Sequence, residues 1–325
     1  MGISSEPTPT LGISVVVPVY NEERNIAPLF ARLKDALDSL NVAYEIIAID
    51  DGSRDGSYSQ LIAHAKEDSH IRVIRFSRNF GQTAALSAGI EHAQGSIIIT
   101  IDSDLENDPR DIHLLLSKLD EGYDVVSGWR KNRWSGSTLT RKLPSVMANR
   151  LISSLTKVHL HDYGCTLKAY RIDVIKGVRL YGEMHRFVPA YAHWQGGRVA
   201  EVPVLYSPRL HGASNYGFSR TFRVLLDLVV IVFIHKYMNR PMHFFGSWGL
   251  LSIALGLFFG TTAVALRLFG IVHLVETPLP ILSALFIIVG IQLVFFGVIA
   301  EMIMRTYYES QGRRPYIIRA NDPVQ

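Results

Sequence analysis

Two aspartates separated by one residue, Asp102 and Asp104, stand directly after a short apolar run at residues 97–101. If that run is a strand of an open α/β sheet, both carboxylates lie outside its carboxyl end, where such sheets bind ligands. One or two carboxylates together with phosphate oxygens often hold Mg²⁺, and a cation there neutralises the charge on a diphosphate. Glu106 follows two residues later and can add a ligand. Asp-x-Asp triplets also occur in solvated turns, so the neighbouring segments decide between these interpretations.

Two further polar segments follow apolar runs in the same way. Residues 17–23 read Val-Pro-Val-Tyr-Asn-Glu-Glu, and residues 50–57 read Asp-Asp-Gly-Ser-Arg-Asp-Gly-Ser. Because the carboxyl ends of parallel strands share one sheet edge, we expect both segments to converge with Asp102 and Asp104. Carboxylates there can accept hydrogen bonds from a base or a ribose, and glycines let the backbone approach a ligand. Turn and helix-capping chemistry is the alternative for residues 50–57.

The elements that must position these groups alternate between two sequence patterns. Apolar, β-branched runs predict strands at residues 13–18, 44–50, 71–76, 97–102, 124–128 and 166–170. Amphipathic stretches between them predict helices at residues 21–40, 57–68, 82–93 and 109–119. This alternation predicts an α/β fold, and the near-continuous apolar runs are typical of strands covered by helices on both faces.

Composition argues against several classes of protein. The 325 residues include 33 lysines and arginines against 29 aspartates and glutamates, and a net charge of +4 is too small to indicate a nucleic-acid-binding face. The single cysteine, Cys165, cannot form a disulfide within the chain, which favours a reducing compartment. Residues 1–12 are polar, and we expect a flexible tail there rather than a signal peptide.

Two stretches in the last third of the chain, residues 244–266 and 278–300, contain no charged residue. Each is about 34 Å long as a helix, enough to cross a hydrocarbon core of about 30 Å. Buried core helices are the alternative. Basic residues flank the pair on both outer sides, which predicts that both flanks are cytoplasmic. Residues 218–240 are interpreted as an interfacial amphipathic helix, with a helix packed on the soluble domain as the alternative.

Taken in order, these motifs resemble those of the inverting family 2 glycosyltransferases with the GT-A fold. Within that family they are similar to the dolichyl-phosphate mannose synthase and bactoprenol glucosyltransferase group. The resemblance extends from residue 13 to about residue 216 and also includes residues 78–81 (Arg-Asn-Phe-Gly) and residues 162–165 (Asp-Tyr-Gly-Cys). The two apolar stretches resemble the bactoprenol branch.

The resemblance implies a nucleotide-sugar site and a metal site. It assigns the donor to Pro18, Tyr20, Glu22, Asp51 and Asp102, with Asp51 facing the base. It assigns Mg²⁺ or Mn²⁺ to Asp102, Asp104 and Glu106, and it makes Asp104 catalytic. Many relatives have glutamine in place of Glu106, so the resemblance supports ligation by Asp104 more strongly. Residues 78–81 either border the donor or only connect a strand to a helix.

The resemblance also implies a lipid monophosphate as the acceptor, which brings close to two negative charges and calls for cations. Arginine suits phosphate because its guanidinium donates paired hydrogen bonds. Arg141 and Ser145 match the group's Arg-x-x-x-Ser pattern for the acceptor phosphate. The set assigned to this phosphate is Arg130, Arg141, Ser145, Lys168 and Arg209. Each alone is also typical of a solvated surface charge, and Lys168 can instead pair with a carboxylate.

Asp162 resembles the family's acidic residue near the acceptor, and we assign it a catalytic role in orientation or proton transfer. A turn residue bonded to local backbone is the alternative. Because a phosphate oxygen is already anionic near neutral pH, it needs no strong general base. Alignment and stabilisation of the leaving group should therefore dominate a single displacement with inversion.

The sequence thus predicts a tail over residues 1–12 and a GT-A (Rossmann-like) domain over 13–217. An interfacial helix over 218–240, two transmembrane helices within 241–304 and a cytoplasmic tail over 305–325 follow. The predicted reaction moves a hexose, glucose from UDP-glucose, to undecaprenyl phosphate at the cytoplasmic face of the inner or plasma membrane. Mannose transfer from GDP-mannose and a non-catalytic membrane scaffold are the alternatives. We also expect a homo-oligomer and no nucleic-acid partner.

Overall fold

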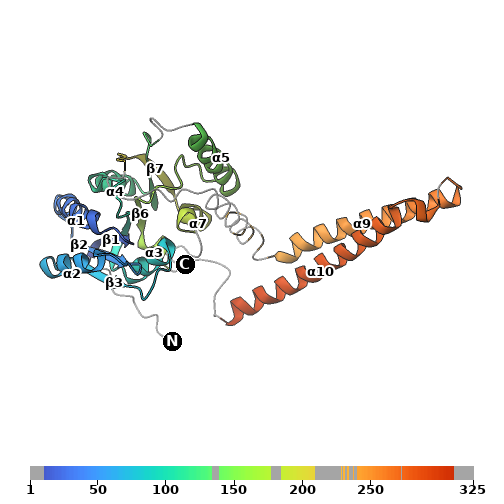
Figure 1. Cartoon of the computed structure of the whole chain (residues 1–325), viewed down its shortest axis with the longest axis horizontal. Helices are drawn as coiled ribbons and strands as arrows, with labels where there is room; N and C mark the ends of the chain where they lie inside the picture. The colour runs from blue at the N-terminus through green and yellow to red at the C-terminus, as the bar shows by residue number, and fades with distance from the viewer. Residues whose placement is uncertain are drawn as a thin grey trace, which may run out of the picture. The chain divides into compact units, whose positions relative to one another are not determined.

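The computed structural model describes residues 11–133, 139–176, 184–208, 240–271 and 273–310, and four single positions between 228 and 237. The chain forms two compact units, Met1–Leu228 and Val229–Gln325, and each is described by itself. The first unit contains a mixed sheet with helices on both faces, and the second contains a pair of long apolar helices (Figure 1).

The described residues of the first unit form one sheet of seven strands. These are β1 (Leu11–Val19), β2 (Tyr44–Asp50), β3 (Ile71–Arg75), β4 (Gly95–Thr100), β5 (Val125–Trp129), β6 (Lys168–Arg171) and β7 (Val199–Pro203). Their order in the sheet is β3-β2-β1-β4-β6-β5-β7, and β6 alone runs antiparallel to its neighbours. The register pairs Val19 with Asp50 and Val16 with Thr100, so β1, β2 and β4 end at the same edge.

Helices cover both faces of this sheet (Figure 1). One face packs against α1 (Glu23–Asp38), α2 (Ser57–Glu67) and α4 (Ile112–Asp120), and the other against α3 (Gln82–His92), α6 (Ile172–Ile175) and α7 (Val188–Trp194). Successive strand residues point to opposite faces. In β1, Val15 and Val17 belong to the first core and Val16 to the second. Two apolar faces explain why the strands read as continuous apolar runs.

The predicted elements form with small shifts of their ends. The strand at residues 44–50 has the predicted bounds, whereas β4 ends at Thr100, two residues earlier than expected. Helix α1 begins at Glu23 because Asn21 adopts a left-handed backbone conformation, with φ of 56°. A 3₁₀ helix, η1 (Pro109–Asp111), precedes α4. A further helix, α5 (Leu139–Thr156), follows β5.

Strand β7 and the reversed direction of β6 are not predicted by the sequence. The four residues Val199, Ala200, Glu201 and Val202 are each half-buried in β7, and its last residue is exposed. The strand therefore lacks the continuous apolar run that identifies the central strands. The sequence of the four residues of β6 does not indicate whether the strand runs parallel or antiparallel to its neighbours.

The second unit consists of α9 (Pro241–Leu268) and α10 (Leu279–Ser310), connected through a 3₁₀ helix, η3 (Leu274–Glu276). Among the described residues, these two helices are the ones long and apolar enough to cross a membrane. They contain the predicted stretch 244–266 and all but the first residue of 278–300. Helix α10 continues beyond residue 304, into the segment predicted as a tail.

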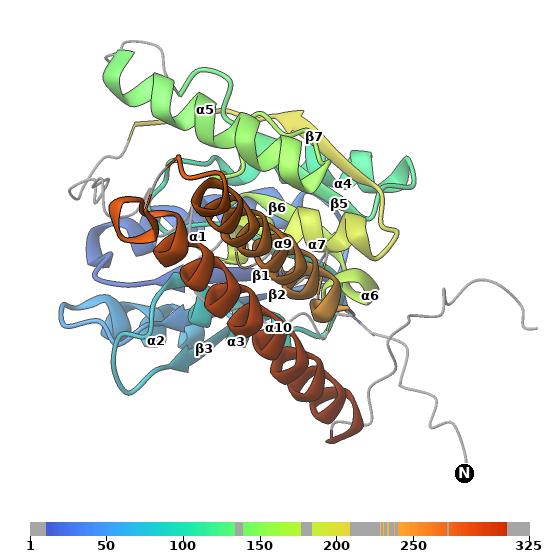
Figure 2. The same ribbon diagram turned by 90° about the vertical axis from the view of Figure 1, so that its right-hand side faces the viewer.

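Helices α9 and α10 run side by side in both views (Figure 1 and Figure 2). Small residues allow their close approach, since a Cβ atom on Gly249 would lie 2.8 Å from the carbonyl oxygen of Gly290. Ser252 Oγ donates a hydrogen bond to the carbonyl oxygen of Phe286 at 2.6 Å. Small side chains and hydroxyl groups of this kind hold membrane helices together, because lipid provides no hydrophobic driving force between them.

Several predicted segments fall outside the described residues. These include the tail at residues 1–10, most of the proposed interfacial helix at 218–240, and residues 311–325. The domain boundaries drawn from the sequence therefore stay predictions.

Candidate active site

The candidate site lies at the sheet edge where β1 and β4 are neighbours. Strands β2 and β3 lie on one side of β1, and β4 lies on the other. Such a reversal of strand order opens a crevice outside the carboxyl ends of the two central strands. A hydrogen bond joins the end of β1 to the turn after β4, because Ser103 Oγ donates to the carbonyl oxygen of Pro18 at 3.0 Å. The backbone of Pro18 is thus bonded to the acidic turn that follows β4.

An open pocket of about 620 Å³ lies at the ends of β1, β2 and β3. Its lining includes Tyr20, whose ring is exposed, and three arginines, Arg54, Arg75 and Arg78. Arg75 is held in place by Asp50, with Nε 3.2 Å from Oδ2. Guanidinium groups and an aromatic ring suit a ligand that combines a flat base with phosphate groups. The pocket is therefore the place in the described part of the chain that best fits a nucleotide.

Asp51 is bonded to the loop that forms one wall of this pocket. Its carboxylate accepts hydrogen bonds from Asn79 Nδ2 at 2.8 Å, from Phe80 N at 2.7 Å and from Gly81 N at 2.9 Å. Burial raises the pKa of Asp51, and the hydrogen bonds from Phe80 and Gly81 oppose that rise. Asp51 thus fixes the wall of the pocket, and its predicted contact with a base stays a proposal.

The same loop contains residues 78–81, whose contact with the donor stays a proposal. Gly52, at φ of 70°, lies so close to this loop that an added Cβ atom would be 2.4 Å from the carbonyl carbon of Arg78. Residues 78 and 79 line the pocket, and Gly81 precedes the first turn of α3. The segment therefore both borders the pocket and connects a strand to a helix.

Glu22 lies at the start of α1 rather than in the pocket lining. Its Oε2 accepts a hydrogen bond from Asn25 Nδ2 at 2.5 Å, and its backbone N donates to Ser57 Oγ at 2.9 Å. These bonds connect the first turn of α1 to the first turn of α2. The predicted nucleotide contact of Glu22 stays a proposal.

The acidic turn after β4 is fixed by hydrogen bonds of its own. Gln82 Nε2 donates to Asp102 Oδ1 at 2.6 Å, and Asp104 Oδ1 accepts from the backbone N of Glu106 at 3.0 Å. Leu105 between them has φ of 60°, so the turn is tight. Burial raises the pKa of Asp102 against hydrogen bonds from Thr166 and Gln82 and the positive charge of Arg130.

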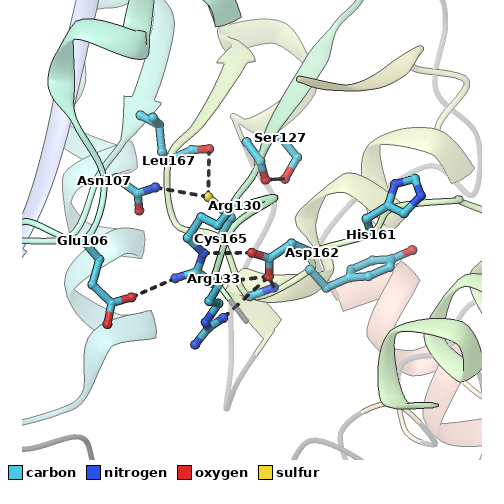
Figure 3. Close-up of polar contacts among 12 residues, drawn as sticks. Glu106, Asn107, Ser127, Arg130, Arg133, His161, Asp162, Cys165 and Leu167 are labelled. Atoms are coloured by element: carbon cyan, nitrogen blue, oxygen red, sulfur yellow. Dashed lines mark hydrogen bonds and ion pairs between the residues drawn. The ribbon is translucent and has the colours of Figure 1, made fainter. Parts of the chain in front are cut away.

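A buried arginine, Arg130, lies between two carboxylates (Figure 3). Its Nη1 donates to Glu106 Oε2 at 2.9 Å, and its Nε and Nη2 donate to the two oxygens of Asp162 at 2.8 Å and 3.2 Å. Arg133 adds a second cation, with Nη1 3.8 Å from Asp162 Oδ1. Burial raises the pKa of Asp162, but the charge and hydrogen bonds of Arg130 and the charges of Arg133 and Lys168 outweigh it and hold the pKa below its usual range.

The predicted roles of Glu106 and Asp162 stay predictions, and this network shows which contacts the two side chains already make. Glu106 faces Arg130, and no group of three His, Cys, Asp or Glu side chains among the described residues is arranged to hold a metal. A cation in this conformation would take Asp102, Asp104 and ligand oxygens, a donor set of hard oxygen ligands that fits Mg²⁺ or Mn²⁺. Asp162 is a weak base because its pKa is lowered. Its position favours the orientation role over proton transfer.

Lys168 is buried, and its predicted contact with the acceptor phosphate stays a proposal. Its Nζ donates hydrogen bonds to the carbonyl oxygens of Cys165 and Tyr163, and burial lowers its pKa. It therefore holds the turn at residues 162–165. The side chains of Arg141 and Ser145, on α5, and the whole of Arg209 lie outside the described residues, so their assignment to the acceptor phosphate stays a prediction.

The chain matches the family model described as Glycosyl transferase family 2 over residues 14–179. This chain belongs to glycosyl transferase family 2. The match contains the pocket, the acidic turn and the Arg130 network. The predicted enzyme class and family are therefore confirmed.

Curated relatives match this family 2 enzyme over nearly its whole length. It is 42% identical to the dodecaprenyl-phosphate galacturonate synthase of Rhizobium johnstonii, over 97% of this chain and 94% of that protein. It is 38% identical to the undecaprenyl-phosphate 4-deoxy-4-formamido-L-arabinose transferase of Shewanella sediminis, over 94% of this chain and 91% of that protein. Both alignments are long enough to include the two apolar helices.

The fold is similar to that of a glucosyl-3-phosphoglycerate synthase from Mycobacterium tuberculosis, solved in complex with Mn²⁺, UDP and phosphoglyceric acid. The TM-score is 0.54 at 19% sequence identity, over 70% of this chain and 78% of that chain. The predicted α/β GT-A fold, followed by two apolar C-terminal helices, is thereby confirmed.

Sequence reasoning misses two residues that the structure brings to this edge, Gln82 and His185. Gln82 bonds Asp102, and His185 Nδ1 lies 2.7 Å from Thr83 Oγ1 in the next position of the same helix. Gln82 could have been found from the sequence, because it is a polar residue that directly follows a glycine at the start of a predicted helix. His185 has no such signal, because its partner is 102 residues away in the chain.

Arg78 supplies a test of the pocket. Its guanidinium carbon lies 4.4 Å from the centre of the Phe80 ring, which holds the cation at the pocket wall. We expect Arg78→Ala to raise the KM for the nucleotide-sugar about tenfold or more, since a hydrogen bond to a charged group contributes about 1.5–3 kcal/mol. Initial rates at varied donor concentration measure this. Arg198→Ala, which removes an arginine stacked on Tyr123 at the opposite sheet edge, should leave the KM unchanged.

Proposed function

We propose that this enzyme transfers a sugar from a nucleotide-sugar to a polyprenyl phosphate at a membrane. One observation carries the proposal: the pocket, the acidic turn, the buried cation Arg130 and the partly buried Arg133 belong to one sheet edge of a family 2 glycosyltransferase. The relatives that match almost the whole chain are named for sugar transfer to dodecaprenyl or undecaprenyl phosphate. The two apolar helices supply the anchor that a lipid acceptor calls for.

The donor sugar that we propose is galacturonate, carried by UDP. The relative with 42% identity is named for galacturonate, and the relative with 38% identity for a formamido-arabinose. These names support a modified sugar ahead of the glucose that the sequence predicts. UDP-glucose and GDP-mannose remain alternatives to be tested side by side with it.

The proposed chemistry is a single in-line displacement at the anomeric carbon with inversion. The attacking phosphate oxygen is already anionic, so the protein has to align it and stabilise the departing nucleotide diphosphate. Asp102 and Asp104 would hold Mg²⁺ or Mn²⁺, which neutralises charge on that leaving group when bound. Arg130, held by Glu106 and Asp162, would contact the acceptor phosphate in this proposal.

The proposed membrane arrangement places both helices across the bilayer with the catalytic unit on the cytoplasmic side. The charged residues of the connection between them are few, whereas Arg240 precedes α9 and arginines follow residue 304. Positive flanks of this kind are retained in the cytoplasm. A homo-oligomer stays an expectation of the sequence.

A donor panel tests the proposal directly. The purified full chain, in detergent with undecaprenyl phosphate and Mg²⁺ or Mn²⁺, is given radiolabelled UDP-galacturonate, UDP-4-deoxy-4-formamido-L-arabinose, UDP-glucose or GDP-mannose. We expect label in the lipid fraction with UDP-galacturonate, and none when the lipid phosphate is omitted. Transfer from one of the other donors, with none from UDP-galacturonate, would show that galacturonate is not the sugar this enzyme transfers. No transfer from any donor, with free nucleotide and sugar as the only products, would contradict the lipid acceptor.

A further inference from the structure

Glu201, in the middle of β7, binds the turn that precedes Asp162. Its Oε1 accepts hydrogen bonds from the backbone N atoms of His161 at 2.9 Å and Asp162 at 3.0 Å. Its Oε2 lies 2.7 Å from Nδ1 of the His161 ring. The carboxylate is 10% exposed, whereas the His161 ring is 67% exposed. One carboxylate on an outer strand of the sheet therefore bonds the backbone of two successive residues of the candidate site.

Two other side chains hold the same turn. The ring of Trp129, the last residue of β5, stacks on the His161 ring at 4.3 Å with an angle of 18° between the planes. Asn149 Nδ2, from α5, donates to the carbonyl oxygen of His161 at 2.7 Å. The register pairs Glu201 with Ser127, two residues before Trp129. The turn is thus held by neighbouring positions of one strand pair and by α5.

The exit of β7 also holds the segment with the second carboxylate of the network. Ser207 N donates to the carbonyl oxygen of Glu106 at 3.0 Å, and Tyr206 forms a bridge with Asn107. Asp162 and Glu106 are the two partners of Arg130. Both carboxylates that orient the buried arginine are therefore positioned from one strand and the residues that follow it.

We propose that Glu201 is a positioning residue that sets the place of Asp162, and through it the direction of the Arg130 guanidinium toward the acceptor phosphate. The inference rests on the proposed function, because it assigns Arg130 to the acceptor side. A carboxylate accepting backbone N–H groups fixes a loop by charge-assisted hydrogen bonds, and a shift of about 1 Å at a reacting group lowers rates about a hundredfold.

The test compares Glu201→Ala with Glu201→Gln in the full chain. Glutamine keeps an oxygen for the two backbone N–H groups and an amide that can face His161 Nδ1, whereas alanine removes all three contacts. We expect Glu201→Ala to raise the KM for undecaprenyl phosphate at least fivefold with the KM for the nucleotide-sugar unchanged. Glu201→Gln should stay within twofold of the parent for both. Equal changes in both KM values, or a glutamine variant as impaired as the alanine variant, would overturn the proposal.

Amide hydrogen exchange gives a readout that needs no substrate. In Glu201→Ala, the peptide covering residues 158–167 should exchange at least tenfold faster, while Glu201→Gln keeps its protection. The matched control is Asp124→Ala, because Asp124 Oδ2 accepts a hydrogen bond from Arg198 N at 2.8 Å at the opposite end of the same strand pair. That variant should change neither acceptor KM nor exchange at 158–167. Unchanged exchange in Glu201→Ala would refute the positioning role of Glu201, even if the parent enzyme transfers sugar to the lipid. Absence of transfer by the parent enzyme would refute the proposed function and leave the exchange result unaffected.

Discussion

Replacing Asp104 by asparagine is expected to lower the rate of sugar transfer about a thousandfold while the protein stays folded. Asparagine keeps the side-chain oxygen that accepts the hydrogen bond from Glu106 N at 3.0 Å, so the tight turn at Leu105 is retained. The substitution removes the charge that would bind a cation. A cation contributes several kcal/mol of charge stabilisation, and each 1.4 kcal/mol is about tenfold in rate.

Two measurements separate this effect from misfolding. Radiolabel transfer to undecaprenyl phosphate reports activity, and Mn²⁺ binding in the presence of UDP, followed by electron paramagnetic resonance, reports the site without turnover. Asp120→Asn changes an exposed aspartate at the end of α4 and should leave both readouts unchanged. Full transfer in the presence of EDTA, or full Mn²⁺ affinity in Asp104→Asn, would contradict the metal assignment.

The parts of the site that the sequence predicts are those carried by local pattern. Asp102 and Asp104 follow an apolar strand directly, and Tyr20 follows another, so the rule that ligands bind at strand ends brings them together. The strand at residues 44–50 is predicted to the residue because it is buried on both faces and is followed directly by the polar turn that begins at Asp51. In each case the physical cause lies within a few residues of the feature.

The contacts that the sequence does not predict join residues far apart in the chain. Arg130 is 24 residues from Glu106 and 32 from Asp162. A guanidinium group binds a phosphate or a carboxylate equally well. Only the folded geometry therefore shows that two carboxylates bind Arg130. Asp51 is a similar case, since its three donors come from residues 79–81 on the next loop.

The buried charges explain why the site needs such contacts. Desolvating a buried arginine costs several kcal/mol, and attraction to nearby carboxylates has to offset this cost. Glu106 and Asp162 supply that compensation while keeping the guanidinium at the sheet edge. The orientation of Arg130 therefore depends on three loops, which carry Glu106, Arg130 and Asp162. Strand β7 contributes to this orientation although its sequence has no recognisable motif.

Arg130→Ala is expected to lose both transfer and stability, because it leaves Glu106 and Asp162 as buried carboxylates without their main cation. Removing one partner of a buried ion pair costs about 3–5 kcal/mol. Thermal unfolding of the detergent-solubilised chain, followed by tryptophan fluorescence, should show a large drop in Tm. Lys118→Ala removes one partner of an exposed pair with Glu121 and should change the unfolding free energy by less than about 1 kcal/mol. A drop no larger than that of Lys118→Ala would contradict the buried network.

Acid provides the same test without removing the arginine. The folded pKa of Asp162 is lowered, so its ionised form stabilises the protein above the unfolded value of about 3.9, and that contribution is lost as pH falls through the folded pKa. The parent should therefore exceed Asp162→Asn in Tm at pH 6, and the difference should shrink as the pH falls below about 4. Burial raises the pKa of Asp162, and Arg130 is the main group that opposes this rise, so in Arg130→Ala the protonated carboxyl is favoured and Tm should no longer fall as the pH drops below about 4. A Tm difference that stays constant from pH 6 to pH 3 would mean that the charge of Asp162 does not stabilise the fold, and would leave Asp162 only a hydrogen-bonding role.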